Sequence, residues 1–441
     1  GVSSFFVRLT EHTCPLRTLI VLRERNDIVV QFIHGADLHL DSPFIGLKSM
    51  PEFVWQAIYR STFDALSQLV SVAIENNVDF VCLVGDIYDS DDRSVKAQAF
   101  FRNEMQRLND KGIPVYLSHG NHDYIGNQGL HLEMPENVIT FGENPETHWQ
   151  TTKQNEKIAL TGFSYTKRWV KERKIIDYPK KNNGADYQIG MLHGFTEGLK
   201  SEHGHYAPFT LNELKSKQYD YWALGHIHKR QQLATHPPII YSGNTQGRNS
   251  KESGPKGCEL VTLTDTKEQI DFCPTATICW EKLELSIKGV ETLDDVYTSI
   301  QQAILCKKNT KYNLFVSIDL KDTQALLDAV RKKITQGELL EALQQIANEE
   351  HFIWVYEIEL VTEKKDNEQN MQLFSEEWQK AVFEMEEEAT FNELTNSFFD
   401  YTELSDLLSS RDSLYRDKII ERAKNQVKSM LTIEGSDEIE N

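Results

Sequence analysis

The chain has 441 residues, a length that accommodates about two or three domains of ~150 residues and excludes a small disulfide-stapled scaffold. Its 47 Lys and Arg residues against 67 Asp and Glu residues give a formal net charge of −20, so a polyanionic substrate must be met by a local basic cleft and not by the whole surface. Hydrophobic residues at 39% and charged residues at 26% are typical of globular proteins and exclude wholesale disorder or a collagen-like chain.

The N-terminal stretch Val2–Arg25 is interrupted by charged residues, so it is neither a spanning helix nor a good signal peptide. We treat residues 1–26, which lack an initiator Met, as an unassigned leader or cloning remnant. The chain has 6 cysteines and no C-x-x-C pair, which disfavours a disulfide framework or a cysteine zinc site. We therefore expect a cytoplasmic protein with no membrane contact.

The segment from Asp27 to about Leu263 alternates short apolar runs with longer helix-like stretches. This alternation predicts strands joined by helices, and hence a layered α/β domain over residues 27–279. Apolar residues at near-helical spacing predict a helix over Phe53–Ile74. The predicted strands are Ile28–Ile33, Phe80–Val84, Val115–Leu117, Ile158–Leu160, Ile189–Leu192 and Trp222–Leu224.

A second, smaller unit is predicted over residues 280–362, where strand-like and helix-like stretches again follow one another. We expect it to be a small α+β domain. Its predicted strands are Leu283–Ile287, Leu314–Ile318 and Phe352–Leu360, and its predicted helices are Leu293–Leu305 and Thr323–Arg331.

Residues 363–441 form an acidic C-terminal region with 20 acidic and 9 basic residues. Apolar stripes over 374–385 and 419–431 predict amphipathic helices, and such helices are able to dock a partner. Helices that pack on their own domain, or a partly disordered tail, explain the pattern equally well.

Five clusters of polar residues each follow a short apolar run. Taken singly, such residues are more often structural than functional, but the complete set in this order indicates a site at the carboxyl ends of the strands. His34 and His119 precede two of the clusters, and we expect them to make hydrogen bonds within the sheet and not to bind metal. The clusters are Asp37-Leu-His39, Gly85-Asp86, Gly120-Asn-His-Asp123, His193-Gly194 and Gly225-His-Ile-His228.

These residue types suit a pair of divalent metal ions. Such a pair needs hard oxygen and borderline nitrogen ligands, with one carboxylate able to bridge both ions. A water bridging the two ions would lose a proton near neutral pH and attack phosphorus, so no covalent nucleophile is required. The candidate ligands are Asp37, His39, Asp86, Asn121, His193, His226 and His228, which leaves His122 over.

At these residues the chain resembles the calcineurin-like metallophosphoesterases. Within that superfamily it resembles the DNA-repair exonuclease branch, of the SbcD type, and most of all the bacterial YhaO group. The flanking sequences Phe32–Pro43, Gly85–Asp89, Gly243–Arg248 and Gly254–Gly257 support this resemblance. It implies a metallophosphoesterase β-sandwich flanked by helices, followed by a small α+β capping domain and a helical C-terminal region.

The resemblance also implies a role for each matching residue. One metal would be held by Asp37, His39, Asp86 and His228, and Asp86 would bridge to a second metal held with Asn121, His193 and His226. His122 would act as general acid or transition-state stabiliser, and Asp123 would orient its imidazole. The cofactors implied are two Mn²⁺ ions, with other divalent metals possible, and the nucleophile implied is a metal-bridging hydroxide.

The function implied is a Mn-dependent DNA exonuclease and endonuclease that processes DNA ends in double-strand break repair. The capping domain would help to grip DNA, residues 363–441 would bind an SMC-like ABC ATPase, and the nuclease-domain helices would form a homodimer. Archaeal and eukaryotic relatives carry a histidine three residues after the bridging aspartate, where this chain has Asp89, so any transition-state role at that position is in doubt.

Two groups of basic residues are candidate DNA contacts. Lys167 and Arg168 begin a basic segment that runs to Lys181. Tyr165, Trp169 and Tyr178 are interleaved with it and would stack on bases. The second group lies beside the ligand clusters, and ordinary solvated surface charge explains both groups almost as well. Its members are Lys229, Arg230 and Arg248.

Two other functions compete with the nuclease. The same metal site would serve a phosphatase or phosphodiesterase for nucleotides or other small phosphoesters, although such an enzyme does not need the extra domain and tail. A non-catalytic scaffold for an ATPase partner would be expected to have lost His122 or a ligand, and this chain has lost none.

Overall fold

The structure is a computed structural model that describes most of the chain up to residue 361 and short parts of the C-terminal region. The leader at 1–26 and most of the acidic region at 363–441 lie outside the described residues, including most of the residues predicted to bind a partner. Among the helices that the structure describes, none is both long and apolar enough to cross a membrane. The described residues are 29–42, 50–89, 93–126, 131–198, 206–307, 311–344, 351–361, 375–386, 390–391, 419–420 and 423–424.

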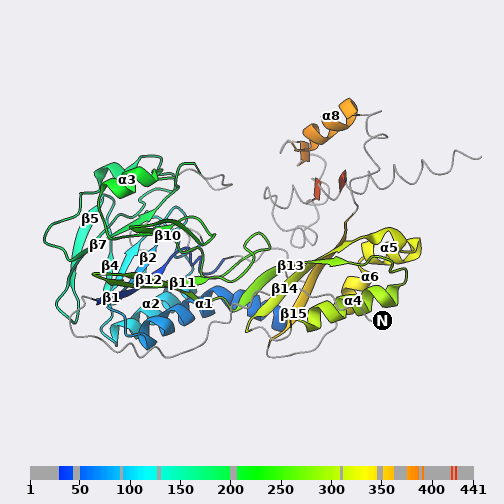
Figure 1. Ribbon diagram of the computed structural model, residues 1–441, viewed down its shortest axis with the longest axis horizontal. Helices are drawn as coiled ribbons and strands as arrows, with labels where there is room; N and C mark the ends of the chain where they lie inside the picture. The colour runs from blue at the N-terminus through cyan, green and yellow to red at the C-terminus, as the bar shows by residue number, and fades with distance from the viewer. Residues whose placement is uncertain are drawn as a thin grey trace, which may run out of the picture.

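The first lobe is built on two six-stranded mixed sheets (Figure 1). The first sheet has the order β12-β11-β1-β2-β3-β4, and the second has the order β5-β6-β7-β8-β10-β9. In the first sheet β1 to β4 run parallel, and in the second β6, β7, β8 and β10 do. The strands of the first sheet are β1 (Val29–Gly35), β2 (Phe80–Val84), β3 (Val115–Ser118), β4 (Val138–Thr140), β11 (Gly257–Thr264) and β12 (Glu268–Pro274). Those of the second are β5 (Glu146–Thr151), β6 (Lys157–Gly162), β7 (Tyr187–His193), β8 (Tyr221–Gly225), β9 (Gln231–Thr235) and β10 (Pro238–Tyr241).

The two sheets pack face to face because successive side chains of a strand point to opposite faces. In β1, Val30 and Phe32 lie in the core between the sheets, whereas Ile33 joins a second core on the outer face of the first sheet. Two helices, α1 (Glu52–Glu75) and α2 (Val95–Asn109), cover that outer face. A third core covers the outer face of the second sheet and includes α3 (Leu211–Ser216) and the 3₁₀ turn η1 (Lys174–Asp177).

All six strands predicted for this lobe overlap strands of the structure, and the predicted helix is α1. The layered α/β class is therefore confirmed. The strands that the sequence patterns did not reveal are β4, β5 and β9 to β12. Of these, β4, β5, β9 and β12 lie at sheet edges and are only partly buried, so they carry no long apolar run.

The second lobe is a three-stranded sheet of order β13-β14-β15 with helices on one face. All of its strand pairs are parallel, so the unit is α/β in character and not the α+β domain that we expected. The predicted helix Leu293–Leu305 is confirmed, whereas Thr323–Arg331 is divided because Leu326 and Leu327 are extended. The elements are β13 (Ile278–Ser286), α4 (Leu293–Leu305), β14 (Asn313–Lys321), η2 (Thr323–Ala325), α5 (Asp328–Thr335), α6 (Glu338–Leu343) and β15 (Ile353–Leu360).

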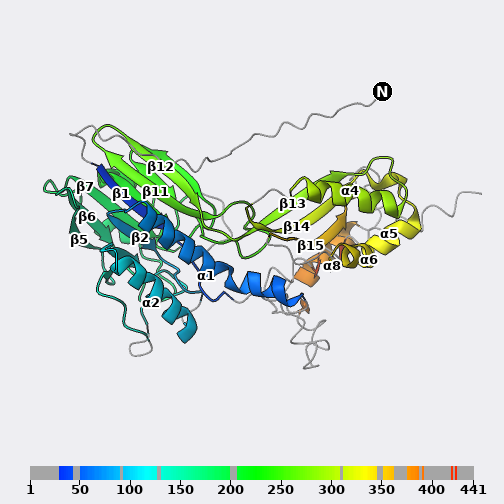
Figure 2. The same cartoon turned by 90° about the horizontal axis from the view of Figure 1, so that it is seen from below.

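Helix α1 connects the two lobes. Figure 2 shows it running from the sheets of the first lobe toward the third sheet. Its C-terminal part packs on the first sheet, while Val54 and Ile58 near its N-terminus pack against aromatic residues of the third sheet, among them Trp280 and Phe315. One continuous helix thus joins the hydrophobic cores of both lobes.

A second connection is the loop between β10 and β11, residues 242–256. The side chain of Gln246 donates to the backbone oxygen of Ile278 (2.8 Å), and the indole of Trp280 donates to the backbone oxygen of Gly247 (3.0 Å). The first residues of β13 therefore hold this loop in place from the second lobe.

Truncation of Ile58 to alanine tests the contact between α1 and the third sheet. Ile58 is fully buried, so we expect Ile58→Ala to lower the free energy of unfolding by about 2–5 kcal/mol, measured by urea denaturation. Ile176→Ala is the matched control because Ile176 is 65% exposed, and we expect a change within about 0.5 kcal/mol. Equal effects of the two substitutions would contradict the described packing.

Candidate metal centre

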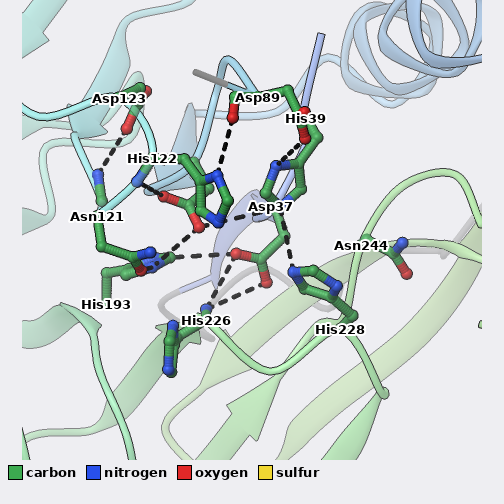
Figure 3. Close-up of polar contacts among 12 residues, drawn as sticks. Asp37, His39, Asp89, Asn121, His122, Asp123, His193, His226, His228 and Asn244 are labelled. Atoms are coloured by element: carbon green, nitrogen blue, oxygen red, sulfur yellow. Dashed lines mark hydrogen bonds and ion pairs between the residues drawn. The ribbon is translucent and has the colours of Figure 1, made fainter. Parts of the chain in front are cut away.

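The predicted site residues meet where parallel strands of both sheets end (Figure 3). Asp37 and His39 follow β1, Asp86 follows β2, Asn121 and His122 follow β3, and the remaining histidines end β7 or follow β8. The turns after β1 and β2 run side by side, because the N–H of Asp37 donates to the oxygen of Gly85 and the N–H of His39 to that of Asp86. The polar side chains of the five clusters are thus collected at one edge of the sandwich.

The backbone around the site is strained. Asp37, His39, Asp86 and His226 all have a positive φ, between 45° and 99°, which non-glycine residues rarely adopt. Two neighbouring glycines are required by space. A Cβ at Gly225 would lie 2.0 Å from the backbone oxygen of Val84, and one at Gly85, whose φ is +76°, would lie 2.1 Å from the ring of His193.

The first group of ligand atoms comes from Asp37, His39 and His228, whose ligand atoms lie within 4.8 Å of one another. The Nε2 atoms of the two histidines are 3.1 Å apart. Burial is the main cause that lowers the pKa of both imidazoles, with the charge of Arg248 adding to it, which favours the neutral form of both rings.

The tautomers of these two histidines follow from carboxylates behind them. Nδ1 of His39 lies 3.1 Å from Oδ1 of Asp89, and Nδ1 of His228 lies 2.7 Å from Oε1 of Glu252. A carboxylate only accepts, so Nδ1 of His228 carries the proton; Nδ1 of His39 makes no hydrogen bond, but the negative charge of Asp89 beside it favours the same tautomer, in which each Nε2 presents a lone pair. Two lone pairs that face each other at this distance cannot form a hydrogen bond, but they fit a cation between them.

The second group comprises Asp86, His193 and His226, whose ligand atoms also lie within 4.8 Å of one another. The Oδ1 atom of Asn121 lies 3.2 Å from Nε2 of His193 and so belongs to the same group. Nδ1 of His193 donates to the oxygen of Val84 (3.1 Å), which leaves Nε2 as the ring nitrogen that faces the site.

Asp86 lies between the two groups. Its Oδ2 atom is 3.9 Å from Nε2 of His39 in the first group and 3.3 Å from Nε2 of His193 in the second. One carboxylate oxygen thus faces both sets of ligands, which fits the bridging role expected of this residue.

The electrostatics of the site favour positive charge. Burial raises the pKa of Asp37 to about 7, against the opposing effect of His193. Although burial acts in the other direction, the carboxylates of Asp86 and Asp37 raise the pKa of His193 to about 9. Buried carboxylates that retain or attract protons in this way would be stabilised by a divalent cation.

His122 stands at the rim of the site and is partly exposed. Its backbone N–H donates to Oδ1 of Asp86 (2.9 Å), and its Nδ1 lies 2.8 Å from the backbone oxygen of Asp89. Since a carbonyl only accepts, Nδ1 carries the proton and Nε2 is left to exchange a proton with a substrate.

The expected role of Asp123 is wrong. Its carboxylate does not orient His122 but accepts from the backbone N–H groups of Gly120 (2.7 Å) and Ile87 (2.9 Å) and pairs with Nδ1 of His119 (3.0 Å). Asp123 therefore stabilises the backbone turn that carries Asn121 and His122. His119 is engaged in this pair, and His34 hydrogen-bonds the hydroxyl of Tyr221 and the oxygen of Leu224, as expected of structural histidines.

Two of the expected DNA contacts form ion pairs with carboxylates of the chain itself. Arg248, whose side chain is 16% exposed, pairs with Asp89 and Glu252 behind the first ligand group. Arg230 pairs with the buried carboxylate of Glu259. Both guanidinium groups therefore have partners within the chain, and their contact with phosphates stays a prediction.

The segment from Lys167 to Lys181 also differs from expectation in part. Tyr165 and Tyr178 are buried, and their hydroxyls donate to backbone oxygens of β7, so neither can stack on a base. Lys167 pairs with Glu172 (2.7 Å), while the guanidinium of Arg168 lies over the ring of Trp169, which is 55% exposed. Lys229 is exposed.

Glu252 was missed by the sequence patterns. It lies between the quoted segments Gly243–Arg248 and Gly254–Gly257, and an acidic residue in a loop gives no local sign that it supports a histidine. Asp89 had been recognised only as a departure from related sequences, whereas the structure places it against His39, His122 and Arg248.

Comparisons with known proteins agree with this geometry. The family model for calcineurin-like phosphoesterases matches residues 30–230. The uncharacterized metallophosphoesterase YhaO of Bacillus subtilis (strain 168) is 38% identical over 348 residues, which are 78% of this chain and 84% of that protein. The DNA double-strand break repair protein Mre11 of Thermoplasma acidophilum is 25% identical over 246 residues, 52% of this chain and 62% of that protein. Mre11 of Sulfurisphaera tokodaii is 27% identical over 253 residues, 53% of this chain and 60% of that protein.

The identity to YhaO extends over most of both proteins, and the family match contains every candidate metal ligand from Asp37 to His228. The two ligand groups that share Asp86 are the arrangement that a dinuclear metal hydrolase needs. The chain therefore belongs to the calcineurin-like metallophosphoesterase family of metal-dependent hydrolases.

Proposed function

We propose that this protein is a Mn²⁺-dependent DNA nuclease that processes DNA ends in double-strand break repair, with exonuclease and endonuclease action. The observation that carries the proposal is the pair of ligand groups that share Oδ2 of Asp86, with His122 at the rim. The similarity to proteins named as DNA double-strand break repair proteins supports DNA as the phosphodiester.

The chain's own residues would divide the work as follows. Asp37, His39 and His228 would hold one ion, Asn121, His193 and His226 the other, and Asp86 both. When bound, such ions neutralise phosphate oxygens and bring the pKa of water toward neutrality. His122, with its ring oriented by the Asp89 carbonyl, would exchange a proton with the phosphodiester or its leaving group through Nε2.

An aromatic path toward the surface supports a polymeric substrate. The ring of Tyr206 lies 5.6 Å from the ring of His226, and the ring of Trp169 lies 5.5 Å from that of Tyr206. Arg168 lies over Trp169, and Lys167 and Lys229 carry further positive charge. A DNA strand leaving the metal centre on this side would meet an exposed indole and a guanidinium, which suit a base and a phosphate.

Hydrolysis of a small phosphoester, such as a nucleotide, is the second candidate. The observation that favours it is the internal pairing of basic residues near the centre. Arg230 and Arg248 are committed to carboxylates of the chain, and the formal net charge is −20, so the long-range field does not attract DNA.

The partners remain proposals that the resemblance supports. Residues 363–441 would bind an SMC-like ABC ATPase, and the chain would form a homodimer. Phe383 on α8 (Ser375–Glu386) is 66% exposed, and an exposed aromatic residue on an acidic helix suits a partner surface. A scaffold without catalysis is disfavoured by the complete ligand set.

Cleavage of end-labelled linear DNA with Mn²⁺ tests the function. We expect shortening of the labelled strand, and we expect His122→Ala to lower the rate by about 10²–10⁴-fold because the proton-transfer group is lost. His148→Ala is the control, since His148 pairs with Glu146 at the surface. Hydrolysis of bis-p-nitrophenyl phosphate or a nucleotide without any cleavage of DNA would refute the nuclease and favour the second candidate.

Metal content tests the centre itself. After dialysis against Mn²⁺ we expect two bound ions per chain by elemental analysis, and we expect Asp86→Asn to reduce this number because one oxygen serves both groups. Asp64→Asn on the surface of α1 should change nothing. Retention of both ions by Asp86→Asn would rule out a bridging role for Asp86.

Substitution of Trp169 tests the proposed DNA path. Stacking of one base contributes about 1–3 kcal/mol, so we expect Trp169→Ala to weaken binding of single-stranded DNA by roughly 5–150-fold in fluorescence anisotropy. Hydrolysis of bis-p-nitrophenyl phosphate should not change. Trp149→Ala is the matched control, because Trp149 is also exposed (50%) but lies on the edge strand β5. Equal binding by the wild type and Trp169→Ala would exclude this path.

A further inference from the structure

We infer that Arg248 is a positioning residue that fixes the first ligand pair of the metal centre, by holding together the two carboxylates that orient His39 and His228. We call Asp89, Arg248 and Glu252 the carboxylate clamp. The inference deepens the proposed metal centre and rests on it.

The clamp joins two chains of polar contacts that come from distant parts of the sequence. In one, Oδ1 of Asp89 lies at ion-pair distance (3.1 Å) from Nδ1 of His39, and in the other, Oε1 of Glu252 accepts a hydrogen bond from Nδ1 of His228 (2.7 Å). The guanidinium of Arg248 contacts both carboxylates, with Nη1 on Oδ1 of Asp89 and Nη2 3.3 Å from Oε1 of Glu252. The oxygens that receive the arginine are the same ones that receive the histidines.

The backbone at Arg248 is also fixed by hydrogen bonds. Its backbone N–H donates to Oε2 of Glu252 (2.7 Å), an oxygen that also accepts from Nδ2 of Asn244 (2.8 Å). The preceding Gly247 is bound through its oxygen to the indole of Trp280 in the second lobe. The guanidinium thus has little freedom to turn away.

The geometry of an arginine suits this task better than that of a lysine. A guanidinium is planar and presents its N–H groups in a rigid fork, so it sets the separation of the two carboxylates that it contacts. Without that fork, two negative carboxylates on the same side of the centre would repel each other and leave their histidines free to rotate. The converging Nε2 atoms, 3.1 Å apart, would then no longer be prearranged for one ion.

Loss of the Arg248 charge and loss of its orienting contacts are expected to change the metal affinity in opposite directions. Removal of a positive charge near the centre would by itself strengthen the binding of a cation, whereas loss of orientation would weaken it. Supporting residues of this kind typically change metal affinity by about 10–100-fold on substitution, so we expect orientation to dominate. Arg248→Lys separates the two effects, because it keeps the charge and removes the fork.

The experiment is a titration of metal-free full-length protein with Mn²⁺, followed by electron paramagnetic resonance of the free ion and by calorimetry. We expect wild type to bind two ions. We expect Arg248→Met and Arg248→Lys to bind one ion as wild type does and the other about 10–100-fold more weakly. Arg173→Met is the matched control, since Arg173 also joins two carboxylates, those of Glu197 and Glu213, but has no contact with the ligands. We expect it to bind both ions normally.

Each other outcome overturns a distinct statement. If Arg248→Met and Arg248→Lys bind both ions as wild type does, or more tightly, the inference is wrong while the metal centre stands. If both variants lose both ions together with a lower thermal midpoint of the metal-free protein, Arg248 is only a structural residue. If wild type itself does not bind two ions, the proposed centre fails before the clamp is tested. Arg248→Lys alone carries the test if Arg248→Met does not fold.

Discussion

The confinement of negative charge at one edge of the sandwich is the constraint on which the rest of the site depends. Asp37 and Asp86 are both buried, and burial of a carboxylate is costly unless it is paired or hydrogen-bonded. The protein meets this cost with donors from neighbouring turns. The backbone N–H of His226 serves both oxygens of Asp37, and that of His122 serves Asp86. The positive φ values of Asp37, Asp86 and His226 show that the backbone accepts strain to make these contacts.

The sandwich supplies this arrangement because its parallel strands all end at one edge. Strands β1, β2 and β3 of the first sheet and β7 and β8 of the second carry the ligands, and the antiparallel edge strands β5, β9 and β12 carry none. Ligands from two sheets can approach each other only where the sheets come close, and the space at Gly225 against Val84 is such a point. The helices stabilise the sheets from outside without entering the site.

Sequence patterns revealed what is local and missed what is distant. Buried parallel strands such as Phe80–Val84 carry continuous apolar runs, and the ligands follow them directly, so both were predictable. Strand β11 was not predicted because Glu259 interrupts its apolar run. This glutamate is buried in an ion pair with Arg230, the residue that precedes β9. Asp123 was misassigned because adjacency to His122 suggested a contact that the turn geometry directs elsewhere. Asp89 and Arg248 are 159 residues apart, and no spacing rule connects them.

The anchoring of the β10–β11 loop on Trp280 and Ile278 has a mechanical consequence. The residues that set the spacing of two imidazoles are fastened to a sheet that contributes no ligand. If a bound nucleic acid or another protein displaced that sheet, the displacement would be transmitted through the β10–β11 loop to Arg248 and Glu252. It would then alter the ligand group of His39 and His228 but not the group of His193 and His226. A movement of the second lobe would thus change the affinity of one metal position and leave that of the other unchanged.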